Sequence, residues 1–201
     1  MISDRDLPIK IITKDIFDTK NWKIISSKRI QYFQSNIFKR YNFNHAFFTI
    51  NCKVNKPEEL QYEIKWDSEI NYLKQIHSSK IIEVLNQSNN KIKEGDGLIT
   101  KENEKSLWLY TADCIPILIA DKKNRYIGVC HTGLKGLQKN ILSKIIIKLE
   151  KIGCRKNNLI IAMGPAINRN NYQVQSEDID SLPIEIIEYH SDLYKSQVKD
   201  L

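Results

Sequence analysis

Two apolar runs separated by a short polar segment form the clearest pattern in the chain. The runs read CIPILIAD (114–121) and RYIGVCHTG (125–133), with the polar residues KKN between them. Short apolar runs bounded by polar turns are typical of buried strands. We therefore expect residues 111–131 to form an antiparallel hairpin, with a tight turn centred between Lys122 and Lys123.

The spacing of apolar positions changes to a helical period after residue 136. Gly153 follows the periodic segment and is a typical helix stop. We expect one helix of about four turns over residues 137–152. Its apolar positions are Leu137, Ile141, Leu142, Ile145, Ile146, Leu149 and Ile152.

The remaining pattern predicts more strands than helices. We expect strands at 45–52 and 158–164, and a strand interrupted or bent around Ser78 and Ser79 within 73–85. Residues 94–100 are expected to form a Gly-Asp-Gly turn that runs into an extended piece, and residues 55–64 a short helix or turn with Pro57 near its start. The last 24 residues are expected to form a polar helix. Strands and helices together place the chain in the mixed α/β (α+β) class.

Length and composition favour one domain over residues 1–201. A chain of 201 residues is long enough for one substantial core. No apolar run approaches the roughly 18 residues that span a bilayer, so we expect no membrane partner. The N-terminus MISDRDLPIK has no apolar leader, which favours a cytoplasmic protein. Its four cysteines are then expected to be free thiols or metal ligands.

The formal net charge of +7 does not by itself indicate a nucleic-acid partner. Lysines are scattered among acids along the whole chain, without the aromatic-interleaved basic stripe that is typical of such proteins. We expect a solvated surface whose charge could help to gather a small anion such as phosphate.

Cys114 and His131 carry the candidate chemistry of the hairpin. In the expected register they lie directly opposite each other, with Cβ atoms about 4.5 to 5.5 Å apart. Both side chains could then bind one ion, whereas a slip of one residue would put them on opposite faces. Cys130 points to the other face by strand alternation and is expected to be a core thiol.

A metal site needs at least a third ligand, and the chain has four histidines. His45 lies in an apolar strand and is expected to be structural, and His190 lies in a polar segment and is expected to be exposed. His77 falls where a strand breaks into small residues, as site residues often do. One thiolate and two imidazoles suit zinc and leave a fourth position open for water or substrate.

Several polar residues near these positions are candidates for substrate contacts. The turn HTGLKG (131–136) offers backbone N–H groups from Gly133, with Lys135 nearby, for an anion such as phosphate. We place Gln75 with them as a substrate-binding candidate. Asp96 and Asp113 are the candidate acid/base residues or supporting carboxylates of the site.

Five motifs in order give the chain a resemblance to a known family. QIHSS, GDGLIT, TADCIPILIAD, GVCHTGLKGL and GPAINRNNYQV resemble the laccase-domain family, across roughly residues 43 to 180. Members were once described as multicopper polyphenol oxidases and are now described as zinc-dependent purine nucleoside phosphorylases. The resemblance implies a four-layer α/β/β/α fold related to cysteine hydrolases, and zinc bound by His77, Cys114 and His131. It implies phosphorolysis of adenosine, inosine, guanosine and methylthioadenosine, with adenosine deamination alongside.

The chain departs from the family pattern at three places. Leu134 and Lys135 stand where the family usually has a Trp-Arg pair, and lysine lacks the planar fork that binds phosphate in a bidentate way. The glycine-rich loop that follows the 45–49 segment in the family is replaced by the shorter INCKVNKPEEL, and the sequence is short at the C-terminus relative to the family. Zinc binding should survive these changes more readily than catalysis.

Three other functions are weighed against the phosphorylase. A true multicopper oxidase needs more imidazoles than four histidines supply, although one copper ion could bind the same three ligands. A metal-free cysteine hydrolase would use Cys114 as nucleophile and His131 as base, and would stay active with a chelator present. A catalytically degenerate relative would bind metal without turnover.

Overall fold

The computed structural model describes residues 20–86, 92–168 and 171–172. Contacts divide the chain into two compact units, residues 1–70 and 71–201. The helix predicted for the last 24 residues and the predicted exposure of His190 lie outside the described residues.

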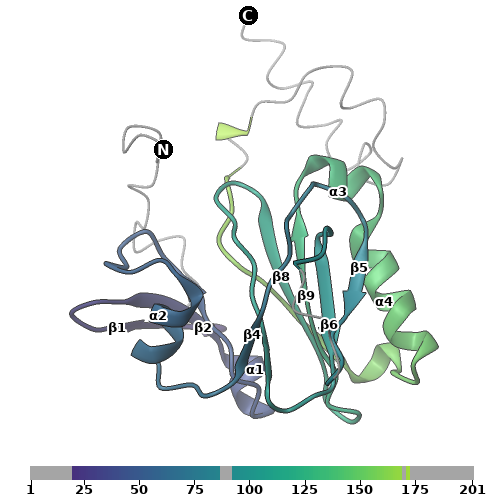
Figure 1. The fold of residues 1–201 in the computed structure, drawn as a ribbon, viewed down its shortest axis with the longest axis horizontal. Helices are drawn as coiled ribbons and strands as arrows, with labels where there is room; N and C mark the ends of the chain where they lie inside the picture. The colour runs from purple at the N-terminus through teal and green to yellow at the C-terminus, as the bar shows by residue number, and fades with distance from the viewer. Residues whose placement is uncertain (1–19, 87–91, 169–170, 173–201) are drawn as a thin grey trace, which may run out of the picture. The chain divides into compact units, whose positions relative to one another are not determined.

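The first unit contains a three-stranded sheet and two short helices (Figure 1). The sheet has the order β1-β2-β3 and is antiparallel. Its elements are β1 (Trp22–Ser26), β2 (Gln31–Ser35), α1 (Asn36–Arg40), β3 (Phe47–Phe48) and α2 (Pro57–Glu63). The short helix predicted near Pro57 is confirmed as α2. Of the strand predicted over 45–52, only Phe47–Phe48 is a strand. Beyond Phe48 the chain turns, and the Cys52 N–H donates to the carbonyl of Thr49 at 3.1 Å.

His45 is a structural residue of the first unit, as predicted. It is buried, its Nε2 accepts the backbone N–H of Ser35 at 2.7 Å, and its Nδ1 lies 2.8 Å from the carbonyl oxygen of Phe43. Burial lowers the pKa of the ring, because the interior disfavours the charged form. Both ring nitrogens are therefore occupied by the unit's own backbone.

The second unit is built on a five-stranded sheet of order β10-β8-β9-β6-β5. Only the β5–β6 pair is parallel among the described pairs of this sheet. The strands are β5 (Ile81–Glu83), β6 (Gly97–Thr100), β8 (Ile115–Asp121), β9 (Ile127–Thr132) and β10 (Leu159–Met163). A small second sheet pairs β4 (Glu69–Asn71) with β7 (Lys105–Leu107), and a 3-10 turn at Lys156–Asn158 precedes β10. The extended piece predicted within 94–100, the strand predicted at 158–164 and the mixed α/β class are confirmed. Of the bent strand predicted within 73–85, only Ile81–Glu83 is a strand.

The hairpin predicted over 111–131 forms as β8 and β9, but residues 111–114 lie outside its strands and its register differs from the expected one. His131 is opposite Pro116 rather than Cys114, so the pairing is displaced by two residues. The cause is a four-residue loop: the Asp121 N–H donates to the carbonyl of Tyr126 at 2.8 Å, and Arg125 adopts a positive φ of 61°. The side chain of Asp121 stabilises this loop by accepting the backbone N–H groups of Lys123 and Asn124.

The helix predicted over 137–152 is confirmed over Ile141–Lys151, but it is not one continuous helix, because a separate short helix precedes it. Helix α3 (Leu134–Gln138) ends before Asn140, and α4 (Ile141–Lys151) begins after it. Asn140 has a φ of 54° and a ψ of 46°, the left-handed conformation that asparagine tolerates better than most residues. The predicted stop at Gly153 agrees with its φ of 98°.

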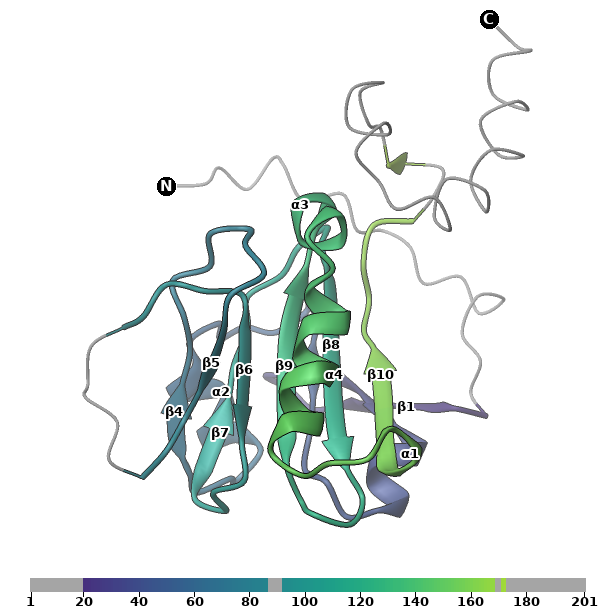
Figure 2. The same cartoon turned by 90° about the vertical axis from the view of Figure 1, so that its right-hand side faces the viewer.

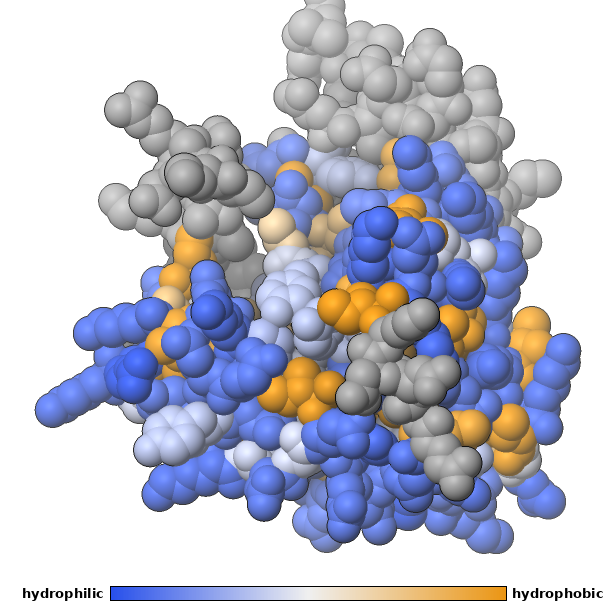
Figure 3. All heavy atoms as spheres, in the orientation of Figure 1, coloured by the Kyte–Doolittle hydropathy of each residue, from blue (hydrophilic) through white to orange (hydrophobic). Residues whose placement is uncertain are grey.

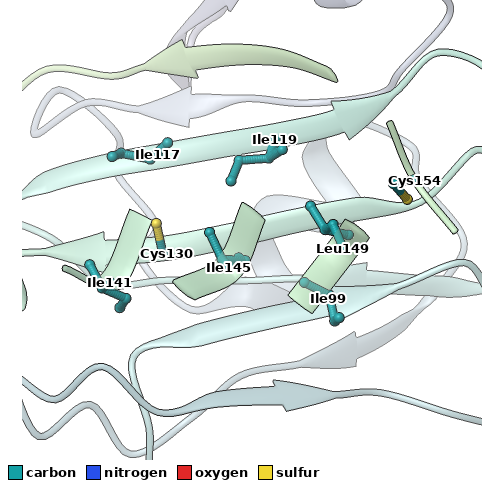
Figure 4. Packing of buried hydrophobic residues seen from close by; sticks show 8 residues of the cluster. All are labelled: Ile99, Ile117, Ile119, Cys130, Ile141, Ile145, Leu149 and Cys154. Carbon is teal, nitrogen blue, oxygen red and sulfur yellow. The ribbon is translucent and has the colours of Figure 1, made fainter. Parts of the chain in front are cut away.

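Helix α4 covers one face of the five-stranded sheet (Figures 2 and 4). The core between them consists of eight buried residues: Ile99, Ile117, Ile119, Cys130, Ile141, Ile145, Leu149 and Cys154. Burying each large aliphatic side chain stabilises the fold by about 1.5 to 3 kcal/mol. Cys130 is fully buried here, so the predicted core thiol is confirmed.

The opposite face of the sheet packs against a smaller cluster. Leu73, Val84, Leu98 and Val129 form this cluster, with Leu107, Leu109 and Leu118 at its edge. The second unit is therefore layered, with a helix on one side of the sheet and the chain around β7 on the other.

The face seen in Figure 3 is mostly hydrophilic, with hydrophobic residues in separate patches. No helix among the described residues is both long and apolar enough to cross a membrane.

Candidate functional site

Three predicted ligands meet at one end of the five-stranded sheet. One donor atom from each of His77, Cys114 and His131 can be chosen so that all three lie within 4.8 Å of one another. His131 is the penultimate residue of strand β9, Cys114 directly precedes β8, and His77 lies in the loop before β5. The structure thus places together the three residues that the sequence and the family resemblance assign to the metal.

The two-residue displacement of the hairpin explains why this convergence survives the wrong register. Side chains alternate between the two faces of a strand, so a shift by an even number of residues keeps both side chains on the same face. Cys114 lies one position beyond the Ile115–Thr132 pair, next to Gly133. It therefore meets His131 diagonally rather than directly across the hairpin.

Asp96 links two of the three candidate ligands. Its side chain is completely buried, and its Oδ1 lies 2.9 Å from Nδ1 of His131. The same carboxylate accepts the backbone N–H groups of Ile76 (3.3 Å), His77 (3.0 Å) and Ser78 (2.6 Å). The hydroxyl of Ser78 also donates to it at 2.7 Å. A carboxylate on Nδ1 orients the His131 ring so that Nε2 is left for a metal ion.

The loop held by Asp96 contains a residue in an uncommon conformation. His77 has a φ of 54°, which lies in the left-handed region. A non-glycine residue there is strained and persists where surrounding contacts hold it. The three backbone N–H groups bound by Asp96 are such contacts, so one buried carboxylate sets both the backbone at His77 and the ring of His131.

Hydrogen bonding and burial act in opposite directions on the ionisable groups of the site. Burial alone would raise the pKa of Asp96, but the hydrogen bonds from His131, Ser78 and Ile76 outweigh it and lower the pKa below its usual value. The pKa of the Cys114 thiol is raised, first by burial and then by the negative charges of Asp113 and Asp96. These effects disfavour the thiolate form of Cys114, and a bound cation would favour it.

Gly133 lies against the candidate ligands. A Cβ atom at this position would lie 2.7 Å from the Sγ of Cys114 and 3.3 Å from Cδ2 of His77. Any side chain would displace the sulfur, so the site requires glycine here for steric reasons. The sequence assigned Gly133 to phosphate through its backbone, and the steric role became visible only in the structure.

The other predicted site residues lie around these ligands in different environments. Asp113 is exposed and directly precedes Cys114, and Lys135 is exposed on α3. Both ends of the Gln75 side-chain amide are bound to the backbone of Tyr110: Nε2 donates to its carbonyl at 2.8 Å, and Oε1 accepts its N–H at 2.9 Å. Substrate contacts of these three residues stay predictions.

Ser78 was expected only to bend a strand and was not named as a site residue, although it donates twice to Asp96. The position of Ser78 directly after His77 could have identified it, because a small hydroxyl residue there can bond to a nearby carboxylate.

The donor set fits a zinc ion. Two imidazole nitrogens and one sulfur are established zinc ligands, and ligand atoms on one tetrahedral zinc lie about 3.5 Å apart given the usual bond lengths. The three donors, all within 4.8 Å of one another, need small side-chain movements to reach that arrangement. Copper accepts the same donors, so the geometry does not set the metal's identity.

Comparison with known proteins identifies the family. The chain belongs to the family described as multi-copper polyphenol oxidoreductase laccase, whose model matches residues 24–197. This confirms the resemblance drawn from the five motifs. Among the described residues, the group of His77, Cys114 and His131 is the one found with three donors able to hold a metal, far fewer than a multicopper oxidase requires.

Several curated relatives carry a phosphorylase name. The chain is 32% identical over 141 residues to the purine nucleoside phosphorylase RC0672 of Rickettsia conorii, which covers 68% of this chain and 58% of that protein. It is 38% identical over 105 residues to a purine nucleoside phosphorylase of Borreliella burgdorferi, covering 52% and 45%. The chain thus spans about half of the length of these relatives.

Solved structures share the fold. YlmD from Geobacillus stearothermophilus superposes with a TM-score of 0.59 at 24% identity, covering 62% of this chain and 50% of that chain. A Neisseria meningitidis protein superposes with a TM-score of 0.60 at 17% identity, covering 85% and 73%. These similarities support the mixed α/β fold of the family.

Proposed function

We propose that the protein is a zinc-dependent purine nucleoside phosphorylase. The observation that carries the proposal is the convergence of His77, Cys114 and His131, supported by a buried carboxylate, in a chain whose curated relatives are named purine nucleoside phosphorylases. Adenosine, inosine, guanosine and methylthioadenosine are the proposed nucleosides, and phosphate is the proposed second substrate. Deamination of adenosine is proposed as a side activity.

Each residue of the site has a proposed role in this reaction. The zinc would be held by His77, Cys114 and His131, and when bound it would act as a Lewis acid. Asp96 orients the His131 ring and holds the His77 loop, so its role is positioning rather than direct proton transfer. Lys135 and the backbone at Gly133 would attract phosphate, and the exposed Asp113 is the proposed acid/base group.

The raised pKa of the Cys114 thiol argues against the metal-free cysteine hydrolase. A cysteine hydrolase needs a thiolate at neutral pH, and the pKa of Cys114 is shifted in the opposite direction. Copper in place of zinc remains chemically compatible with the three donors. Metal analysis of the purified protein, combined with activity, separates these functions.

The test is incubation of zinc-loaded protein with adenosine, with and without phosphate, followed by chromatographic separation of the products. We expect adenine to form only with phosphate, and to be lost in His77→Ala and Cys114→Ala. A matched control is His45→Gln, because His45 is a buried histidine whose ring is bound by backbone of the first unit.

Other products would change the assignment. Inosine formed without phosphate would make the protein a deaminase first. Turnover that persists with a chelator would favour the cysteine hydrolase. Absence of product from zinc-loaded protein would contradict the phosphorylase proposal.

A further inference from the structure

Two exposed tyrosines form a pair close in the chain to the candidate metal ligands. The rings of Tyr72 and Tyr110 have centroids 6.5 Å apart and an interplanar angle of 87°. Tyr72 is 36% exposed and Tyr110 is 52% exposed. A perpendicular neighbour can cover at most one face of a ring, and exposed aromatic faces are the surfaces on which nucleic-acid bases stack.

Tyr110 is fixed in place by the same loop that carries His77. The Gln75 amide makes two hydrogen bonds with the backbone of Tyr110, at 2.8 and 2.9 Å. Gln75 directly precedes Ile76, where Asp96 begins to bind the loop's backbone. Gln75 is hydrogen-bonded to Tyr110, and the next residue, Ile76, is hydrogen-bonded to Asp96. The backbone of Tyr110 is therefore linked to the buried carboxylate of the site through two adjacent residues.

Chain spacing also keeps Tyr110 near the ligands. It precedes Cys114 by four residues, so their Cα atoms can be at most about 15 Å apart. Gln75 precedes His77 by two residues, which limits the distance between their Cα atoms to about 7.6 Å. A nucleoside whose sugar lies at the metal ligands would therefore have its base directed towards the neighbourhood of Tyr110.

We propose that Tyr110 is the platform on which the purine base stacks, with Tyr72 supporting its ring. This inference rests on the proposed function and adds the subsite for the base. Stacking on an aromatic ring tolerates different bases, because every base has a π-face. Such a platform suits an enzyme that accepts adenine, hypoxanthine and guanine as leaving groups.

The test measures binding of the free base, so that it does not depend on catalysis. Isothermal titration of zinc-loaded protein with adenine is compared for the original chain, Tyr110→Ala and Tyr110→Phe. We expect about a 5- to 150-fold loss of adenine affinity in Tyr110→Ala, the range for losing one aromatic stack, and near-original affinity in Tyr110→Phe. Tyr62→Ala is the matched control, because Tyr62 is an 80% exposed tyrosine of the first unit.

A second ligand distinguishes a base subsite from a general loss of structure. Ribose 1-phosphate lacks the base, so its affinity should be unchanged in Tyr110→Ala. Zinc content should also be unchanged. An equal loss of affinity for adenine and ribose 1-phosphate in Tyr110→Ala would overturn the inference. It would also be overturned if Tyr110→Ala bound adenine normally but lost association with another protein, because the tyrosines would then form a protein contact.

The outcomes also separate this inference from the proposed function. If the original chain binds adenine through Tyr110 but releases no adenine from adenosine, the phosphorylase proposal fails and the base platform stands. If the original chain releases adenine and Tyr110→Ala binds adenine equally well, the phosphorylase stands and the platform is overturned. No measurable adenine binding by the original chain overturns the platform.

Discussion

The buried carboxylate of Asp96 lies 2.9 Å from Nδ1 of His131 and also accepts the backbone N–H of His77 at 3.0 Å. One side chain thus fixes the ring of one candidate ligand and the backbone of another. Because neither contact involves a metal atom, the two histidines are positioned before an ion arrives.

Replacing Asp96 should weaken metal binding. In Asp96→Asn the amide nitrogen would face N–H donors, so the bonds to His131 and to the 76–78 loop cannot all be kept. We expect zinc affinity to fall about 10- to 100-fold, the usual effect of losing such a partner. Competition with a chromophoric chelator measures it. Asp113→Asn removes an exposed carboxylate next to Cys114, and an equal loss in that variant would contradict the positioning role.

Asp96 should also make the metal-free protein acid-sensitive. Its pKa in the folded chain is lowered from the usual 3.8, so the carboxylate stabilises the fold at pH above its unfolded pKa. This stabilisation is lost as the pH falls from about 3.8 through the lower folded pKa. Urea unfolding with chelator at several pH values should show the advantage of the original chain over Asp96→Asn shrinking in that acidic window. A difference that stays constant with pH would exclude this linkage.

A methyl group at Gly133 should disrupt the ligand set. The added Cβ would meet the Cys114 sulfur at 2.7 Å, a distance that forces the sulfur or the backbone to move. We expect Gly133→Ala to fold with much reduced zinc affinity. Gly136→Ala is the matched control three residues further along, within α3, because its Cβ would meet no atom closer than 3.4 Å. Full zinc binding by Gly133→Ala, measured by titration and metal analysis, would refute the steric argument.

The break between α3 and α4 should depend on Asn140. Its left-handed conformation costs most residues about 1 to 2 kcal/mol, whereas glycine adopts it freely. Asn140→Ala should therefore lower the free energy of unfolding by roughly 1 kcal/mol, and Asn140→Gly should leave it nearly unchanged. Thermal and chemical unfolding of the two variants provide the comparison. A more stable alanine variant would indicate that α3 and α4 can merge into one helix.

The sequence was most informative where a local pattern determines structure. The two apolar runs with a polar turn between them identified the hairpin of β8 and β9. Strand alternation then indicated the burial of Cys130, because the period of a strand is set by its own backbone. Pro57 marked the start of α2 for a similar local reason.

Features that depend on tertiary contacts were not predictable in this way. The hairpin register depended on a loop stabilised by the Asp121 side chain, and the helix break depended on the conformation of a single asparagine. The hydrogen bonds of Asp96 to residues 76–78 join segments about twenty positions apart, and no local period records them. Asp96 was therefore recognised as a candidate residue, while its hydrogen bonds to the backbone of the 76–78 loop were not.

The three candidate ligands come from separate parts of the chain, in the order His77, Cys114 and His131. An ion bound by all three would close two loops at once, as a pair of cross-links does, and would limit how far the unfolded chain can expand. Its release would have to precede complete opening of the sheet at this end. The bound metal would then lower the rate of unfolding. The lifetime of the folded chain would depend on the metal supply as well as on the packing of its hydrophobic core.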